Sequence, residues 1–266
     1  MTSVFSFWRG DISWVERCSA ASMAEHGIKL TVFTPDVAQV RASGLVADVR
    51  DARGVFDDPS IDWLLKARPD HWTDIFRTEG LAQGLGTWAD LDLIFVNPLP
   101  ENGYLIGRNG TGINTAVLRL PVGSPVLADY LSLCRRRPLP LVGPYQPLAR
   151  RVCGHLNIAR KKLFGRRLPP PALGGGTVEQ IVKRRGVEAE LLPAHVFYPV
   201  PIRDLELFYQ DAHTIDAMLE PDTVSVHLWN RQFTNRFGRK LPPKGSWLGN
   251  IVQRYEPRPN LLMAAE

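Results

Sequence analysis

Two aspartates in an apolar stretch carry the strongest chemical signal of this chain. Asp90 and Asp92 lie two residues apart within the segment 87–96, whose other residues are mostly apolar and predict a strand. An unpaired carboxylate is costly to bury, so both need a partner. In a strand, residues i and i+2 face one side, and carboxylate oxygens suit Mg²⁺ or Mn²⁺. The pair therefore predicts a metal site that holds a nucleotide diphosphate, the alternative being a pair at a water-exposed strand end.

A third acidic residue lies on the helix predicted just upstream, over residues 73–85. Asp74 and Arg77 are three positions apart, so they share one helical face near the entry of the strand. Such an aspartate can accept hydrogen bonds from sugar hydroxyls, and an arginine can bridge sugar and phosphate oxygens. The alternative is that Asp74 caps the helix N-terminus and forms only a local ion pair with Arg77.

The elements that must position these residues alternate between strand and helix. A strand at 3–8, a helix at 13–26 that stops at Gly27, and a strand at 29–34 are typical of an α/β nucleotide-binding fold. The glycine-rich dinucleotide fingerprint and the phosphate loop are both absent from the sequence. Further elements are expected downstream of a variable region at 36–70: short strands between 104 and 120, a helix at 125–134, a helix at 177–186, strand-like pairs at 191–192 and 197–198, and a last strand at 224–229.

Length alone permits one domain or two, and we interpret the chain as one α/β domain over residues 1–255, followed by a tail at 256–266. An insertion at about 135–176 is dense in proline, glycine and arginine, which predicts loops and an exposed basic helix. The chain has a net charge of +5, and its basic clusters lie at 135–137, 150–167 and 183–185. Such clusters bind nucleic acid, an anionic membrane or a phosphorylated substrate, and the alternative is a solvated basic face.

Targeting signals and cysteine pairs give no support for secretion. The longest apolar runs are far shorter than the roughly twenty residues of a membrane helix, and the N-terminus lacks a signal-peptide pattern. Cys18, Cys134 and Cys153 are scattered and are expected to be ordinary thiols. We therefore expect a cytoplasmic protein, peripheral at the inner membrane face if residues 135–167 contact anionic lipid.

The stretch from Thr73 to Asp92 resembles a block found in glycosyltransferases with the DXD sugar-binding region. Its pattern is Thr-Asp, two apolar residues and Arg, followed after a gap by Gly-Leu-Gly-Thr-Trp-Ala-Asp-Leu-Asp. That group includes α-1,6-mannosyltransferases and α-1,4-galactosyltransferases. The resemblance implies a GT-A fold, with a mostly parallel central sheet flanked by helices, retention of anomeric configuration, and dependence on Mn²⁺ or Mg²⁺. Residues 84–88 depart from the usual Gly-Gly-x-Tyr in spacing and aromatic type.

By position, the resemblance implies a role for each matching residue. Asp74 and Arg77 would hold the donor sugar, Asp90 would contact ribose and metal, and Asp92 would chelate the metal. The flanking matches are less specific, and core positions are the alternative for Trp8 and His227. They are Phe7 and Trp8 beside the nucleotide base, Asn114 at the sugar or acceptor, His227 in the metal or diphosphate shell, Lys244 at phosphate, and Ser246 on a mobile lid.

These readings together predict a retaining, metal-dependent glycosyltransferase. It would move a hexose or N-acetylhexosamine from a nucleotide-sugar, with UDP favoured, to a glycan or lipid-linked acceptor, as in polysaccharide biosynthesis. No second carboxylate nucleophile can be assigned, so a covalent double displacement stays open. The alternatives are a non-catalytic basic module that binds RNA or membrane, and a nucleotide-sugar hydrolase that uses the same site. No nucleic-acid motif is present, and nucleic acid is not expected as a partner.

Overall fold

The computed structural model describes residues 2–110, 112–166, 169, 171–238 and 240–256. Of the tail expected at 256–266, all but Glu256 lies outside the described residues, as do residues 167, 168 and 170 of the expected insertion.

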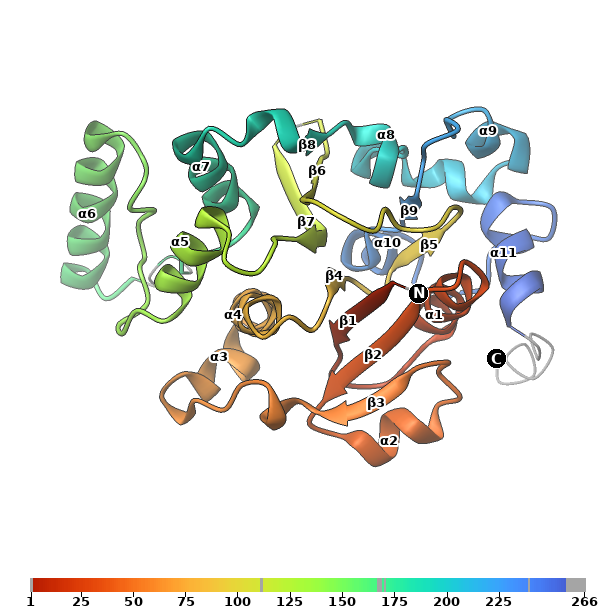
Figure 1. Cartoon of the computed structure of the whole chain (residues 1–266), viewed down its shortest axis with the longest axis horizontal. Helices are drawn as coiled ribbons and strands as arrows, with labels where there is room; N and C mark the ends of the chain where they lie inside the picture. Colours follow the sequence, from red (N-terminus) through yellow and green to blue (C-terminus); the bar gives the residue numbers. More distant parts are fainter. Residues whose placement is uncertain (1, 111, 167–168, 170, 239, 257–266) are drawn as a thin grey trace.

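A seven-stranded sheet forms the centre of the molecule, in the order β3-β2-β1-β4-β7-β6-β8 (Figure 1). Strands β1, β2, β3 and β4 are mutually parallel, as are β6 and β8, whereas β7 runs antiparallel to both of its neighbours. The expected α/β class with a mostly parallel sheet is therefore confirmed. The strands of this sheet are β1 Ser3–Phe7, β2 Lys29–Thr34, β3 Asp48–Asp51, β4 Thr87–Ala89, β6 Leu105–Arg108, β7 Ile113–Arg119 and β8 Leu191–Leu192, and a second sheet pairs β5 Leu93–Phe95 with β9 Ser225–His227.

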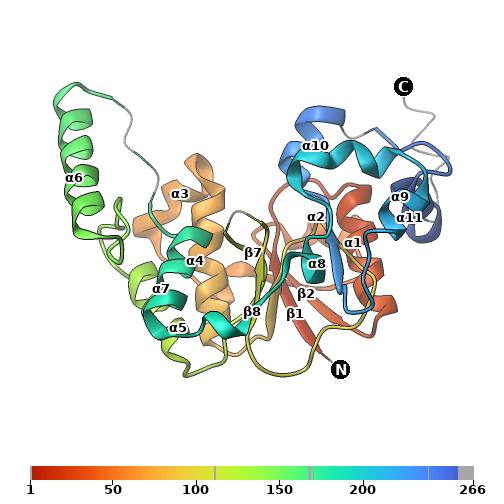
Figure 2. The same ribbon diagram turned by 90° about the horizontal axis from the view of Figure 1, so that it is seen from above.

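Helices cover both faces of the central sheet (Figures 1 and 2). The α-helices are α1 Trp14–Glu25, α2 Val37–Ala42, α3 Asp62–Ala67, α4 Pro69–Ala82, α5 Pro125–Cys134, α6 Leu148–Leu163, α7 Gly175–Arg185, α8 Ala194–Phe197, α9 Ala212–Asp216, α10 Asn230–Phe237 and α11 Trp247–Tyr255. The 3-10 helices are η1 Ala52–Gly54, η2 Pro59–Ile61, η3 Glu188–Glu190 and η4 Ile202–Tyr209.

Successive side chains of the central strand β1 pack into two different hydrophobic cores. In β1, Val4 points into one core with residues of α1, α10 and α11, whereas Phe5 and Phe7 point into another with residues of α4, α5 and α7. Successive side chains of a strand face opposite sides, so one apolar strand holds both layers in register. The carboxyl end of β1 is thereby fixed between the two helical layers.

The single strand predicted over 87–96 is wrong. Strand β4 ends at Ala89, Asp90 to Asp92 form a turn, and β5 begins at Leu93 in the second sheet. The two halves have different partners, since β4 pairs with β7 and β5 pairs with β9. The two carboxylates therefore lie outside the paired strands, at the point where the two sheets meet.

Other departures concern ends and short elements. Helix α4 begins at Pro69 rather than at about residue 73, with proline at the first position where its missing N–H costs nothing. The region 36–70, predicted only as variable, contains α2, β3 and α3. The strand-like pair at 197–198 is also wrong, because Phe197 ends α8. The exposed basic helix expected in the insertion is present as α6.

Among the described residues, no helix is long and apolar enough to cross a membrane.

One glycine at the start of α7 is required by close backbone approach. A Cβ at Gly175 would lie 2.2 Å from the carbonyl oxygen of Ile113 in β7, whereas a Cβ at Gly176 would meet nothing within 4 Å. Gly175→Ala is therefore expected to lower the free energy of unfolding by about 1–3 kcal/mol through overpacking. Gly176→Ala, the matched control, should stay within about 1 kcal/mol of wild type or gain stability. Urea denaturation of both variants tests this, and equal stabilities would contradict the close approach.

Candidate active site

A pocket of about 720 Å³ lies at the carboxyl ends of β1 and β4. These strands are neighbours in the sheet, but the chain leaves β1 toward β2 on the other side, so the crevice lies where the strand order reverses. Ligands of open α/β sheets bind at such points. The volume is in the range of small-molecule sites. Its lining residues are Ser6, Phe7, Trp8, Asp70, His71, Thr73, Asp74, Arg77, Trp88, Asp90, Leu91, Asp92, Gly174, Asn230, Arg231, Thr234 and Asn235.

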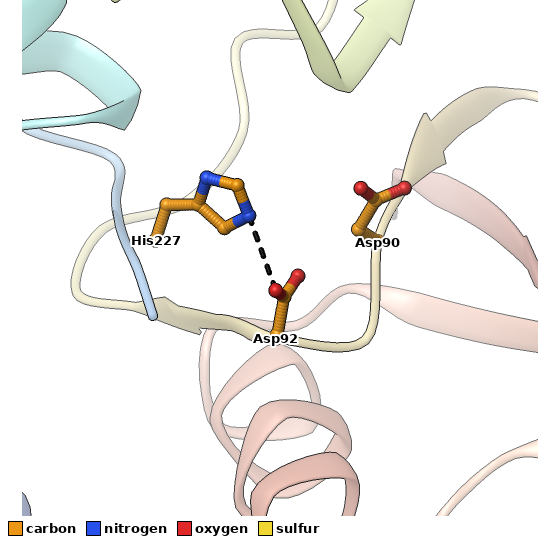
Figure 3. Close-up of side chains that lie close together, drawn as sticks. All are labelled: Asp90, Asp92 and His227. Atoms are coloured by element: carbon orange, nitrogen blue, oxygen red, sulfur yellow. Dashed lines mark ion pairs between the residues drawn. The ribbon is translucent and has the colours of Figure 1, made fainter. Parts of the chain in front are cut away.

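The carboxylates of Asp90 and Asp92, which line this pocket, converge with the buried imidazole of His227, which is not among the lining residues (Figure 3). One ligand atom each of Asp90, Asp92 and His227 lies within 4.8 Å of the others. The Nε2 atom of His227 lies 3.2 Å from Oδ2 of Asp92, and the backbone N–H of Asn230 donates to the same oxygen at 2.7 Å. His227 comes from β9, more than 130 residues after the turn that carries the aspartates. Pairing of β5 with β9 is what brings the three together.

The three groups shift one another's pKa values. Burial raises the pKa of Asp90 to about 6, and the charge of Asp92 adds to the rise while Arg77 and His227 oppose it. Burial also disfavours the Asp92 anion, but His227 and the Asn230 N–H outweigh it and lower the pKa of Asp92. For His227, burial favours the neutral ring, yet the two aspartates raise its pKa above the ordinary value. The site therefore gathers negative charge that a cation would stabilise.

This set of groups fits a divalent cation. Carboxylate oxygens with one imidazole nitrogen are ligands that Mn²⁺ accepts, and the carboxylates alone suit Mg²⁺. Within the described residues, the Nδ1 atom of His227 is buried without a hydrogen-bond partner. Nε2, and not Nδ1, faces Asp92, so Nε2 is the atom that would meet an ion between the carboxylates (Figure 3). Asp90, Asp92 and His227 are the residues that would hold the ion.

Trp88 connects the metal-site candidates to Arg77. Its indole N–H donates to Oδ1 of Asp90 at 2.7 Å, and the guanidinium of Arg77 lies 4.9 Å from its ring centroid. The ring is fully buried and packs edge-on against Phe5 of β1. The tryptophan, a departure from the tyrosine of the sequence pattern, thus fixes the direction of the Asp90 carboxylate.

Asp74 and Arg77 are buried side by side on α4 and both line the pocket. Arg77 donates to Oδ1 of Asp74 at 3.0 Å and to the backbone carbonyl of Thr115 at 2.6 Å. The local ion pair considered from sequence is therefore present. The capping alternative is wrong, because α4 begins at Pro69 and places Asp74 inside the helix.

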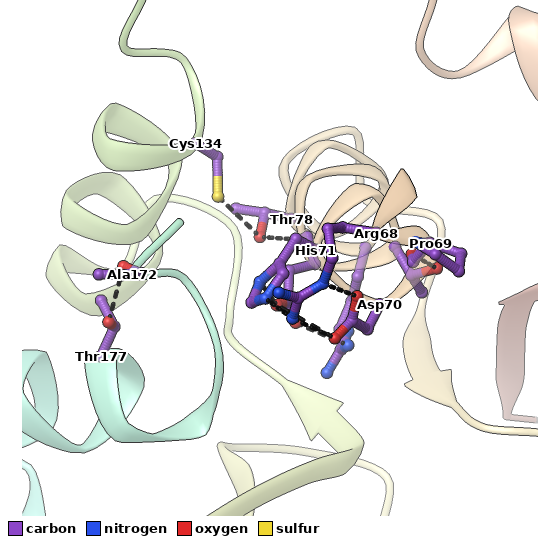
Figure 4. A network of polar contacts seen from close by, with 11 residues as sticks. Arg68, Pro69, Asp70, His71, Thr78, Cys134, Ala172 and Thr177 are labelled. Atoms are coloured by element: carbon purple, nitrogen blue, oxygen red, sulfur yellow. Dashed lines mark hydrogen bonds and ion pairs between the residues drawn. The ribbon is translucent and has the colours of Figure 1, made fainter. Parts of the chain in front are cut away.

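The first turn of α4 adds two pocket residues, Asp70 and His71, that the sequence did not single out (Figure 4). Arg68 forms an ion pair with Asp70 at 3.0 Å and contacts Nε2 of His71 at 2.8 Å. The Nδ1 atom of His71 lies 3.5 Å from Oδ2 of Asp74, so His71 extends the Asp74–Arg77 pair toward the pocket. Their only sequence signal was proximity to the recognised block, a few residues downstream.

The N-terminus of α10 supplies the opposite wall of the pocket. Trp229 precedes it in the left-handed region, with φ 55° and ψ 51°, which is rare for a bulky residue. Its indole N–H donates to the carbonyl of Val200, and its ring lies 4.2 Å from that of His227. This turn directs the Asn230 N–H at Asp92 and brings Arg231 to the pocket. Among the described residues, Arg231 has no ion-pair partner, so its charge is available to a ligand.

The remaining predicted residues divide between pocket and periphery. Phe7 and Trp8 line the pocket, although Phe7 packs mainly on the aromatic core and Trp8 is the more exposed of the two. Asn114, Lys244 and Ser246 are not among its lining residues. The Ser246 hydroxyl caps α11, accepting from the Gly249 N–H and donating to the Pro243 carbonyl. Asn114 Oδ1 accepts from the Ala116 N–H within its own strand.

A family model matches the C-terminal part of the chain. Residues 177–258, close to a third of the chain, match the family model described as the alpha 1,4-glycosyltransferase conserved region. The matched region includes β9 with His227 and α10, and it lies apart from the D-x-D block recognised in the sequence. This match supports the resemblance and a glycosyltransferase enzyme, consistent with a GT-A-like family.

Two solved structures resemble the chain more distantly. One is PaToxG glycosyltransferase, with 12% identity, a TM-score of 0.46, and coverage of 96% of this chain and 85% of that one. The other is the apo-form glycosyltransferase GlyE of Streptococcus pneumoniae TIGR4, with 14% identity, a TM-score of 0.36, and coverage of 97% and 63%. Neither likeness is close enough to assign a residue role. No curated protein matches the chain.

Proposed function

We propose that the chain is a metal-dependent, retaining glycosyltransferase that moves a hexose or N-acetylhexosamine from a UDP-sugar to a glycan or lipid-linked acceptor. The observation that carries this is the convergence of Asp90 and Asp92, which line the pocket, with the buried His227, next to the N-terminus of α10. Two carboxylates beside a single imidazole face the N-terminus of α10 and Arg231, for which no ion pair is found among the described residues, and this arrangement suits a metal–diphosphate ligand.

The diphosphate of the donor would lie between the acidic cluster and α10. A helix N-terminus carries a partial positive charge, which favours phosphate. Arg231 adds a full charge in the first turn of that helix and lines the pocket. We assign to Arg231 the phosphate-neutralising role that the sequence suggested for Lys244. Binding through Lys244 and Ser246 would require the chain before α11 to move.

The donor sugar would lie against α4, and the base beside β1. Asp74, His71 and Arg77 offer acceptors and donors on one side of the pocket, already oriented by their mutual contacts. Trp8 is partly exposed, and its indole N–H donates to the carbonyl of Asp11, which fixes the ring at the mouth of the pocket. An aromatic face held in this way suits stacking of a nucleotide base.

The metal, when bound, would neutralise the charge that develops on the departing nucleoside diphosphate. Arg231 and the partial positive charge at the N-terminus of α10 would stabilise the same charge from the opposite side. Asp74 is a pocket carboxylate, but Arg77 occupies one of its oxygens and His71 approaches the other. A carboxylate so engaged is a poor nucleophile, which favours attack by the acceptor on the face that the diphosphate leaves, with retention of configuration. No covalent intermediate is then needed.

Calorimetric titration of UDP and GDP into the wild-type protein tests the donor site. We expect UDP to bind with Mn²⁺ present and its binding to be lost in excess EDTA, since the clustered carboxylates would then repel the diphosphate. Tighter binding of GDP than of UDP would mean that the donor carries guanine instead of uracil. Binding that does not depend on metal would contradict the metal site. Binding of neither nucleotide would remove the proposal.

Product analysis separates transfer from the alternatives. A transferase releases UDP from a UDP-sugar in proportion to an added acceptor, whereas a hydrolase releases it with water alone, and a binding module releases none. Location in the cytoplasm and contact of the insertion with membrane stay predictions.

A further inference from the structure

The outer face of α6 exposes an apolar stripe. Leu148, Val152, Leu156 and Leu163 are spaced by four, four and seven residues, so they share one helical face, and Phe164 follows directly. Their exposed fractions range from 49% to 80%. These five make up more than half of the nine large apolar residues found exposed among the described residues. Exposed apolar residues gathered on one element mark an interaction surface.

The opposite face of α6 is turned toward the rest of the protein. Gly154, Ile158 and Lys161 line a cavity together with Leu141 and Val142 of the preceding loop. A Cβ at Gly154 would lie 3.0 Å from the Val142 side chain, so the helix backbone approaches the loop closely. Helix α6 itself stands at one end of the molecule, away from the sheet (Figures 1 and 2). The apolar stripe therefore faces away from the body.

The same helix is strongly basic. It contains Arg150, Arg151, Arg160, Lys161 and Lys162 and no acidic residue. Those five equal the whole excess of 32 Lys and Arg over 27 Asp and Glu in the chain. Among the described residues, none of them forms an ion pair. By helical spacing, Arg160 lies on one flank of the apolar stripe, and Arg151 and Lys162 on the other.

We propose that α6 is a docking surface for an anionic lipid bilayer, with the stripe of Leu148, Val152, Leu156, Leu163 and Phe164 inserted at the interface and the flanking cations at the headgroups. A large apolar face flanked by lysine and arginine is the arrangement of helices that lie in the membrane plane. Each basic residue near an anionic leaflet adds about fivefold in affinity. Charge complementarity selects this occupant over a second copy of the chain, because two such helices would bring like charges together.

The test is co-sedimentation of the full chain with vesicles of phosphatidylcholine, with and without phosphatidylglycerol. EDTA is present and nucleotide is omitted, so that the result is independent of the donor site and of the proposed function. We expect binding to anionic vesicles and at least about tenfold weaker binding to neutral ones. Equal binding to both, or binding to neither, would overturn the proposal.

Two sets of substitutions assign the binding to α6. Leu156→Glu with Leu163→Glu interrupts the apolar stripe and leaves the cations in place. We expect at least about a tenfold loss of affinity for anionic vesicles. Arg151→Gln, Arg160→Gln and Lys162→Gln together remove the three cations that flank the stripe, with an expected loss of roughly a hundredfold. The matched control is Val46→Glu with Val122→Glu. It adds the same charges outside α6, at residues that are 56% and 67% exposed, and should lower the affinity for anionic vesicles much less than the change in the stripe.

The helix has no buried residue, so these variants should keep their fold, which thermal unfolding checks. Sedimentation velocity tests whether a second copy of the chain binds the stripe instead. A dimer dispersed by Leu156→Glu and Leu163→Glu, in a protein that does not bind vesicles, would assign the stripe to a second copy instead.

Discussion

Asp92→Asn is expected to lower glycosyl transfer by about a hundred- to a thousandfold and to abolish the dependence of UDP binding on Mn²⁺. Asp92 accepts the Asn230 N–H and pairs with His227, and it faces Asp90 across the site. Asparagine keeps the shape and one acceptor oxygen but removes the charge that a cation requires. The measurement is the initial rate of UDP release with acceptor present, together with calorimetry at increasing Mn²⁺.

A matched control exists elsewhere in the chain. Asp222 lies 3.2 Å from Nε2 of His195, the same separation as between Asp92 and His227, but both residues of this second pair are at the surface. Asp222→Asn makes the same chemical change in the same kind of contact, and transfer should be unchanged. If both variants lose activity alike, loss of stability rather than loss of a metal ligand is the explanation, and unfolding midpoints show which.

The parts of the fold that the sequence predicted correctly carry their signals locally. Helix α1 has a capping box. The Ser13 side chain accepts from the backbone at the helix start, and the Glu16 carboxylate accepts from the backbone N–H of Ser13. Gly27 follows its end with φ 69°. Strand β2 is an apolar run directly after that stop. Each signal lies within a few residues of the element it specifies.

The acidic turn shows where local signals fail. The apolar residues on both sides of Asp90 and Asp92 are equally suited to one long strand or to two short ones. The outcome depends on β9, which arrives from more than 130 residues later and takes β5 into a second sheet. The residue types therefore singled out the two carboxylates, while their placement beside His227 depends on a long-range pairing.

The wall built by α10 had no local signal. Nothing in the sequence around Trp229 indicates a left-handed residue, because such a conformation is normally given to glycine or asparagine. Burial of the indole between Tyr198, His227 and the Val200 carbonyl holds it there. Sequence reasoning consequently looked for the phosphate-neutralising cation at Lys244, whereas the turn presents Arg231.

The largest effect on stability is expected at Arg77. Its side chain is almost completely buried, donates to Asp74 and to the Thr115 carbonyl, and lies over the Trp88 ring. Arg77→Met keeps most of the volume but leaves the buried Asp74 carboxylate without its cation. Breaking such a pair costs about 3–5 kcal/mol, because the remaining charge stays desolvated. Urea denaturation measures the loss.

Adding Asp74→Asn to Arg77→Met should recover part of that stability, since the stranded charge is then gone, although each substitution alone removes contacts. Arg185→Met is the matched control. Arg185 pairs with Asp129 at 2.6 Å, but its side chain is 37% exposed, so its loss should cost about 1 kcal/mol or less. If the double variant is no more stable than Arg77→Met, the cost comes from packing over Trp88 and the Thr115 hydrogen bond. Arg77 would then act mainly by joining α4 to the sheet, and donor-sugar binding would depend on Asp74 and His71.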